Sequence, residues 1–120
     1  MAFTLPKSRR LQRRPQFHAV RDDGERLPSG TVVLNWRLLP ADEPWQVGII
    51  TTRSIGNAVA RNRARRWIRE ALRRLQGRLA VPAHLVFIAR PSISKACYAW
   101  VAKDLDRALK RAGLLAPEAA

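Results

Sequence analysis

The residues with the clearest chemistry in this chain are the arginines of AVARNRARRWIREALRRL, residues 58–75, which number seven in eighteen positions. A guanidinium is planar and always charged, and it binds phosphate oxygens in pairs. Only Glu70 in this stretch is acidic. Like charges at helical neighbour spacing destabilise a helix by a few tenths of a kcal/mol per pair. The pattern therefore favours an external polyanion that neutralises the arginines.

The rest of the chain carries the same bias. Its 120 residues hold 23 Lys and Arg against 9 Asp and Glu, for a net charge of +14, and 47% of them are hydrophobic, which is enough for one packed domain. A surplus of this size predicts a polyanionic partner. The single cysteine, Cys97, excludes an intramolecular disulfide, and no apolar run approaches the roughly 18 residues of a membrane helix. We expect a cytoplasmic protein with no membrane partner.

Hydrophobic periodicity predicts an α+β fold, an α/β sandwich of three helices and a mixed sheet of about four strands in the order α-β-β-β-α-β-α. We treat residues 1–120 as a single domain, with the basic segment 1–14 and the tail 114–120 expected to be flexible. The predicted elements are a helix over 15–21, a strand over 31–39, a second strand over 45–53 antiparallel to it, a helix over 58–76 with Gly77 as its C′ residue, a central strand over 84–90, and a helix over about 95–112 with Ser94 as its N-cap.

A helical wheel separates the residues of 58–76 into two faces. The apolar stripe consists of Ala60, Ala64, Trp67, Ile68, Ala71, Leu72 and Leu75. The opposite face carries the row Arg61, Arg65 and Arg69, with Arg66 and Arg73 beside it and Asn62 and Arg63 at the first turn. A solvated basic face is the plainer interpretation, but such faces normally mix both signs of charge. We therefore predict a surface that follows successive phosphates of a nucleic acid.

Three other interpretations stay open at this stage. His18 and His84 would serve a two-histidine ribonuclease, although nothing in the sequence places them together. A general RNA-binding or ribosomal-type module would share the charge and the fold class. A DNA major-groove reader would need a helix-turn-helix partner for the arginine helix, and the turn signals do not supply one. The acidic residues are scattered, so no metal site is predicted in the protein alone.

The stretch IGNAVARNRARRWIRE, residues 55–70, resembles the signature of the protein component of bacterial ribonuclease P. That family carries a Gly-Asn turn, then an Arg-Asn-Arg triplet, then further bases on the same helix, then Arg-Glu. The segments LPKSRRLQRRPQFHAV, VGIITT and LVFIAR lie where the family places them, so the resemblance covers roughly residues 5–112. A bare triplet would be weak evidence, whereas a sixteen-residue run in this element order is specific.

The resemblance implies a division of labour with RNA. An RNA subunit would carry the active site and use Mg²⁺, held mainly by that RNA and the substrate, to hydrolyse the phosphodiester at the 5′ end of precursor tRNA. One protein per RNA would bind this ribonuclease P RNA through its arginine helix. The implied RNA-binding residues are Arg61, Asn62, Arg63, Arg65, Arg66, Arg69 and Arg73.

The resemblance also implies a cleft for the 5′ leader, between the first helix and one face of the sheet. The implied cleft residues are Phe17, Arg21, Val33, Asn35, Ile50, Thr52 and Arg53. Phe17 has two open interpretations, stacking on a base or anchoring the first helix to the sheet. Arg21 stands where family members often have a second aromatic residue. The family's strand–helix–strand crossover is left-handed, against the general right-handed rule, and we follow the family here.

Overall fold

Four strands form one mixed sheet in the order β1-β2-β4-β3. The computed structural model describes residues 7–116. The strands are β1 (Glu25–Ser29), β2 (Val32–Leu38), β3 (Gln46–Ile50) and β4 (Ala83–Ala89), and the helices are α1 (Arg14–Asp23), α2 (Ala58–Leu75) and α3 (Tyr98–Arg111). Short 3-10 turns occupy Lys7–Arg9, Arg53–Ile55, Gln76–Arg78 and Pro91–Lys95. The predicted α+β class and its element order are confirmed.

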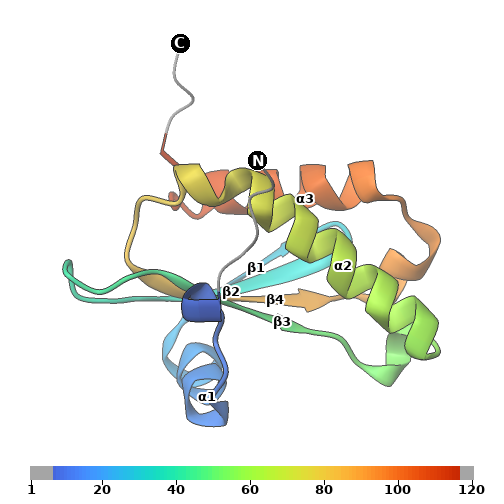
Figure 1. Cartoon of the computed structure of the whole chain (residues 1–120), viewed down its shortest axis with the longest axis horizontal. Helices are drawn as coiled ribbons and strands as arrows, with labels where there is room; N and C mark the ends of the chain where they lie inside the picture. Colours follow the sequence, from blue (N-terminus) through green and yellow to red (C-terminus); the bar gives the residue numbers. More distant parts are fainter. Residues whose placement is uncertain (1–6, 117–120) are drawn as a thin grey trace.

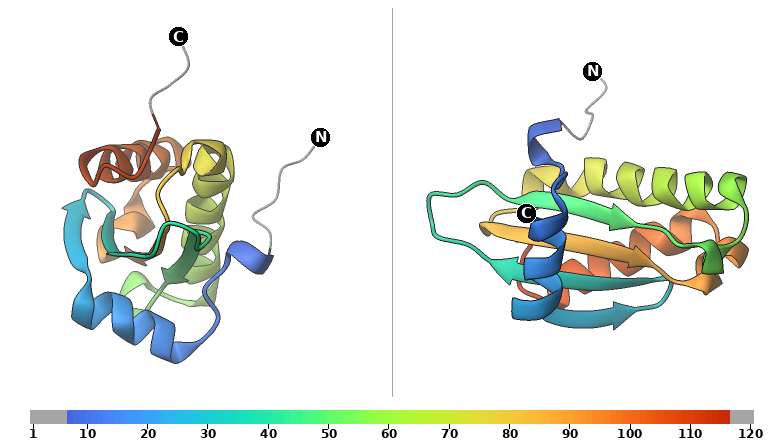
Figure 2. Two further views of the ribbon diagram at one scale, coloured as in Figure 1. Left: turned by 90° about the vertical axis from the view of Figure 1, so that its left-hand side faces the viewer. Right: turned by 90° about the horizontal axis from the view of Figure 1, so that it is seen from below.

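The central strand is β4, as its nearly continuous apolar run predicts. It pairs antiparallel with β2 and parallel with β3. The strand β3 is therefore antiparallel to β2 in direction, as predicted, but β4 lies between them. The connection from β3 through α2 to β4 is a left-handed crossover: seen from the α1 side, both strands point the same way, β4 lies below β3, and α2 lies behind the sheet (Figure 2).

The helices form layers on the two faces of the sheet. Figure 1 shows α2 and α3 over one face and α1 against the other. The larger core lies under α2 and α3 and contains Leu34, Ile68, Phe87 and Leu105, all fully buried. A smaller cluster of Leu11, Val20 and Val86 lies under α1. Val32, Leu34 and Trp36 alternate along β2 and face the larger core, and the opposite face of β2 packs against α1.

Both edges of the sheet are protected. The edge strand β1, which sequence periodicity did not delimit, contains Pro28, and proline is tolerated in a sheet mainly at an edge because it has no N–H to donate. At the other edge the backbone N–H of Leu11 donates to the carbonyl of Val47 over 2.8 Å. Residues 7–14, for which flexibility was expected, lie along β3 and in the first turn of α1. Residues 114–116 of the tail also pack on the domain, since Leu114 is buried and the N–H of Ala116 donates to the carbonyl of Arg78 over 2.7 Å. Residues 1–6 and 117–120 lie outside the described residues.

The helix ends differ from the prediction in two places. Gly77 lies inside the 3-10 turn Gln76–Arg78 and lacks the positive φ of a C′ glycine, because the chain tightens there instead of reversing. Ser94 lies inside the turn Pro91–Lys95, so α3 begins later, with Cys97 at its N-cap and exposed rather than on the apolar face. The apolar face of α3, Val101, Leu105, Ala108 and Leu109, is fully buried.

One buried carboxylate joins α3 to the turn between β1 and β2. Asp104 Oδ2 accepts hydrogen bonds from the backbone N–H of Thr31 over 2.8 Å and from its hydroxyl over 2.7 Å. Ser29 Oγ donates to the carbonyl of Asp104 over 2.8 Å. Gly30 occupies the intervening turn with φ of 58°, a conformation that suits glycine. These contacts fix the hairpin against the last helix.

Candidate RNA-binding surfaces

The arginine helix α2 begins at a defined cap. Asn57 Oδ1 accepts the backbone N–H of Ala60 over 2.9 Å, which satisfies one of the free donors at the helix start. Gly56 precedes it with φ of 143°, a backbone conformation that side chains rarely adopt. The buried Ile55 anchors this turn to the larger core. The Gly-Asn pair therefore sets the position from which the arginines project.

One row of arginines lies along the β3 side of α2. Arg61 Nη1 donates to the carbonyl of Gly56 over 2.8 Å, and Arg65 Nη2 donates to Thr51 Oγ1 over 2.6 Å. Arg69 is exposed, and burial of part of its side chain, followed by the charges of Arg10 and Arg65, lowers its pKa. Within residues 7–116 no carboxylate pairs with Arg61, Arg65 or Arg69. Their positive charges therefore lie close together without being neutralised. Such a cluster favours the binding of phosphate.

The N-terminal segment brings Arg10 to this row. Leu11 bonds to Val47, and Gln46 Nε2 donates to the carbonyl of Ser8 over 3.0 Å, so the segment lies along β3. The guanidinium of Arg9 lies 4.4 Å from the centre of the Trp45 ring. Sequence reasoning missed Arg10 as a neighbour of Arg69, because no local pattern shows which strand edge the segment pairs with.

The other flank of α2 is partly neutralised. Arg73 Nε donates to Glu70 Oε1 over 2.8 Å and Arg74 Nε to Glu70 Oε2 over 3.0 Å. The hydrogen bonds from Arg73 and then from Arg74 lower the pKa of Glu70 to about 2. The same contact with Glu70 raises the pKa of Arg73. Of the predicted RNA-binding set, Arg73 is therefore the one that pairs with a carboxylate among residues 7–116.

The remaining predicted residues lie on the outer face and the flank toward α3. Asn62 and Arg66 are exposed, and the guanidinium of Arg66 makes no hydrogen bond or ion pair within the described part of the chain. Arg63 lies 5.3 Å from the centre of the Trp67 ring and donates to the carbonyl of Ser94 over 3.5 Å. Trp67 is half-buried rather than fully in the core. The arginines thus cover the outer face of α2 and both of its flanks.

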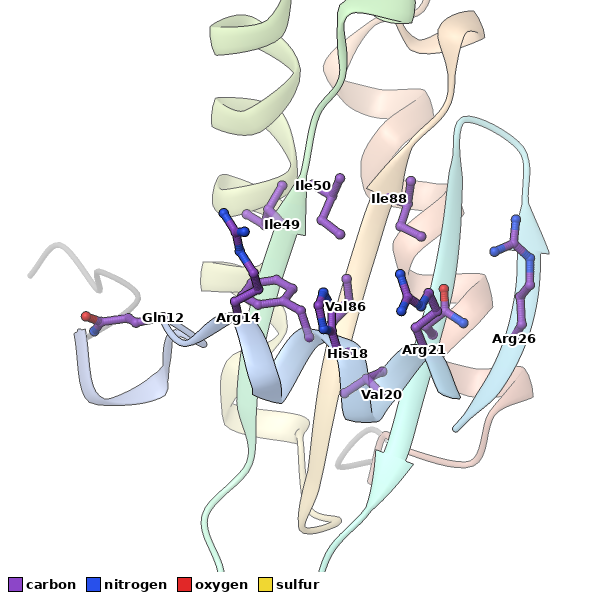
Figure 3. Close-up of a pocket in the computed structure, with 12 residues that line it drawn as sticks. Gln12, Arg14, His18, Val20, Arg21, Arg26, Ile49, Ile50, Val86 and Ile88 are labelled. Carbon is purple, nitrogen blue, oxygen red and sulfur yellow. The ribbon is translucent and has the colours of Figure 1, made fainter. Parts of the chain in front are cut away.

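A cleft of about 510 Å³ lies between α1 and the face of the sheet opposite α2. Figure 3 shows Ile50, Val86 and Ile88 on the sheet, with Arg14, His18 and Arg21 projecting from α1 and Arg26 from β1. The complete lining is Gln12, Arg14, Phe17, His18, Val20, Arg21, Arg26, Asn35, Ile49, Ile50, Val86 and Ile88. An apolar surface rimmed by cations suits a chain that presents both flat bases and phosphates.

Four of the seven predicted cleft residues line this cavity, namely Phe17, Arg21, Asn35 and Ile50. Val33 is on the same face of β2 but is 5% exposed and buried. Thr52 and Arg53 follow the end of β3 and are exposed, outside the lining. The structure thus divides this predicted set between the cleft and its surroundings.

Sequence reasoning missed Arg14, His18 and Arg26 in the cleft. The first two share a helix face with Arg21, at steps of three and four residues, which is the signal that would have found them. Arg26 lies on the strand that periodicity did not delimit. The half-buried Phe17 packs against Gly48, so its ring contacts both the sheet and the cavity.

The two histidines do not share a site. His18 lines the cleft, whereas His84 is outside the lining, with its Nδ1 buried and unpaired in residues 7–116. Burial, followed by the charge of Arg37, lowers the pKa of His84. Among the described residues no three His, Cys, Asp or Glu side chains come together as a metal site, and no helix has both the length and the hydropathy needed to cross a bilayer.

Comparison with known proteins gives one consistent result. The sequence model of the Ribonuclease P family matches residues 5–113. A ribonuclease P protein component of Brevibacillus brevis is 34% identical over 111 residues, which cover 92% of this chain and 88% of that protein. One of Thermus scotoductus is 48% identical over 82 residues, which cover 68% of this chain but only 48% of that protein. The ribonuclease P protein structure from Thermotoga maritima superposes with a TM-score of 0.75 at 30% identity, over 85% of this chain and 96% of that one.

Proposed function

This chain belongs to the Ribonuclease P protein family, and on that premise we propose that it is the protein subunit of the ribonucleoprotein that removes the 5′ leader from precursor tRNA. The RNA subunit carries the active site in this proposal, and the protein is not itself the catalyst. One observation supports it best: two basic surfaces lie on opposite sides of the same sheet, the arginines of α2 on one side and the cleft under α1 on the other. A protein of this form binds two RNA segments at once.

The arginine face of α2 is the proposed contact with the RNA subunit. Arg65, Arg66 and Arg69 occur on a rigid 18-residue helix, so their guanidiniums meet phosphates at fixed separations. The N-terminus of α2 adds partial positive charge beside Arg61 and Asn62. Arg10 extends the same row from the N-terminal segment. Arg73 contributes less, because Glu70 already neutralises it.

The cleft is the proposed site of the 5′ leader. A single-stranded leader exposes bases that stack on an aromatic ring, and Phe17 offers part of its ring to the cavity. Arg14, Arg21 and Arg26 around the rim would hold the leader phosphates. Asn35 on the sheet supplies an amide for a base edge or a sugar. Since Arg21 replaces a second ring, charge and hydrogen bonds carry more of this binding than stacking does.

Mg²⁺ is proposed to be held mainly by the RNA subunit and the substrate. Among residues 7–116 no three His, Cys, Asp or Glu side chains come together, and the proposed role of the protein is to contact RNA phosphates through its arginines. Arginines that neutralise phosphates lower the repulsion between the folded RNA and its substrate. The protein is therefore expected to reduce the Mg²⁺ concentration that cleavage requires. We propose one protein per RNA, in the cytoplasm.

Reconstitution tests this function. The full-length protein, a bacterial ribonuclease P RNA and a precursor tRNA are combined at low Mg²⁺, and each component is omitted in turn. We expect cleavage at the 5′ end of the mature tRNA sequence only when both RNA and protein are present. Cleavage by the protein without the RNA would contradict an RNA active site, and equal cleavage with and without the protein would contradict a role for it.

A further inference from the structure

The exposed face of α3 carries a second group of nucleic-acid-binding side chains. Trp100, Lys103, Arg107 and Arg111 recur at steps of three and four residues, so they share one side of the helix, and all four are exposed. We call these four residues the α3 strip. They lie opposite Val101, Leu105 and Leu109, which face the larger core.

The α3 strip combines one apolar ring with three cations, and no acidic residue of α3 pairs with these cations. Trp100 is 61% exposed, which is unusual for so large an apolar side chain. The two acidic residues of α3 are engaged elsewhere, because Asp104 is bound to Thr31 and Asp106 Oδ2 pairs with the ammonium of Lys110 over 3.0 Å. Within residues 7–116 no carboxylate pairs with Lys103, Arg107 or Arg111. Their charge is available to a partner.

We propose that the α3 strip binds an unpaired segment of the RNA subunit, with one base stacked on Trp100 and the adjoining phosphates on Lys103, Arg107 and Arg111. This inference rests on the proposed function. Cations four residues apart on a helix are separated by about 6 Å along its axis, a distance comparable to the separation of successive phosphates along a strand. A base needs to be unpaired before an indole can stack on its face.

The position of α3 favours the RNA subunit over the leader. The helices α2 and α3 lie side by side over one face of the sheet, and α1 lies against the opposite face (Figure 2). The cleft is lined by residues of α1 and of that opposite face. A large folded RNA lying against the arginines of α2 therefore reaches α3, while a leader in the cleft is separated from α3 by the sheet. A second copy of this chain is disfavoured as the partner, because identical cationic strips repel each other.

Binding of the full-length protein to a bacterial ribonuclease P RNA transcript tests the inference. We expect Trp100→Ala to weaken binding roughly five- to 150-fold, the range of one base–aromatic stack, and Trp100→Phe to retain most of the affinity. Arg107→Ala should lower the slope of log K against log salt by about 0.7, the value for one single-strand phosphate. Lys110→Ala, which removes the same charge from the same helix but from a residue paired with Asp106, should change the slope much less. Circular dichroism and urea unfolding verify that each variant is folded.

An α2 variant separates this inference from the proposed function. If Arg65→Ala weakens RNA binding while Trp100→Ala and Arg107→Ala leave it unchanged, the α3 strip does not bind RNA, and the proposed function is unaffected. The α3 strip would then contact an acidic protein partner or solvent. If Arg65→Ala also has no effect, the proposed function itself fails. Equal slopes for Arg107→Ala and Lys110→Ala would likewise overturn the inference, since they would reflect overall charge and not contact.

Discussion

Phe17 of α1 lies directly over Gly48 of β3, with no room for a side chain between the ring and the strand. A Cβ placed on Gly48 would lie 2.3 Å from Cε1 of Phe17, well inside van der Waals contact. The absence of a side chain at Gly48 therefore lets the Phe17 ring approach the sheet, and the ring forms part of the cleft lining. Binding of the leader in the cleft therefore depends on this pair.

The first prediction concerns Gly48 itself. Gly48→Ala should push the Phe17 ring outward and destabilise the protein by about 1–3 kcal/mol, because the added methyl overpacks the contact. The displaced ring should also reduce the preference for precursor over mature tRNA in the reconstituted enzyme. Urea unfolding and paired binding measurements check both effects. Wild-type stability together with wild-type preference would show that the two residues are not coupled in this way.

A pair of substitutions at Phe17 separates stacking from packing. Phe17→Leu keeps an apolar side chain against Gly48 and Leu11 but removes the aromatic face, so we expect a nearly folded, stable protein that has lost discrimination between leader-bearing and mature tRNA. Phe17→Ala should lose the same discrimination and also some stability. The comparison uses the affinity ratio for the two RNAs. Full discrimination in Phe17→Leu would assign the ring to packing alone.

The buried carboxylate of Asp104 is predicted to stabilise the fold without acting on RNA. Asp104→Ala leaves the N–H and hydroxyl of Thr31 without their partner, which should lower the free energy of unfolding by about 2–3 kcal/mol. Asp22→Ala is the matched control, since within residues 7–116 the Asp22 carboxylate meets only the exposed Arg21 over 3.1 Å and should contribute less than about 1 kcal/mol. Equal losses in the two variants would argue against a special role for Asp104.

The pairing of Glu70 predicts a dependence of stability on acid. Its pKa falls from the ordinary 4.5 to about 2 in the folded protein, because Arg73 and then Arg74 bind the ionised carboxylate. The stabilisation is fully present above the unfolded pKa of 4.5 and is lost as the pH falls toward about 2. Urea unfolding at several pH values should therefore show a steeper loss for the wild type than for Glu70→Gln over this window. Parallel curves would contradict the pairing.

Much of the fold could be predicted from the sequence, because local patterns encode it. The alternation of Val32, Leu34 and Trp36 predicts which face of β2 meets the larger core, and the stripe of Ile68 and Leu72 does the same for α2. The strand β1 was not delimited, because five residues that include Pro28 carry no clear period. Its role depends on pairing with β2, a contact that the short segment does not encode alone.

The candidate sites were predictable where one element contains them. The arginines of α2 share a helix face, so their spacing predicts a common surface. Two features depend on contacts between distant segments, which hydrophobic periodicity does not reveal. They are the proximity of Arg10 to Arg69 and the position of Arg26 in the cleft lining. Glu70 pairs with both Arg73 and Arg74, at the i,i+3 and i,i+4 spacings at which helix side chains meet.

The salt dependence of binding to a bacterial ribonuclease P RNA tests the central claim most directly, that the arginine face of α2 lies against that RNA. We expect Arg65→Ala and Arg69→Ala each to lower the slope of log K against log salt by about 0.9, as for one lost duplex phosphate contact, and to weaken binding to this RNA more than to an unrelated folded RNA of equal length. Arg74→Ala, on the same helix but paired with Glu70, should change the slope less. Unchanged slopes for Arg65→Ala and Arg69→Ala, or equal binding of both RNAs by the wild type, would contradict the account.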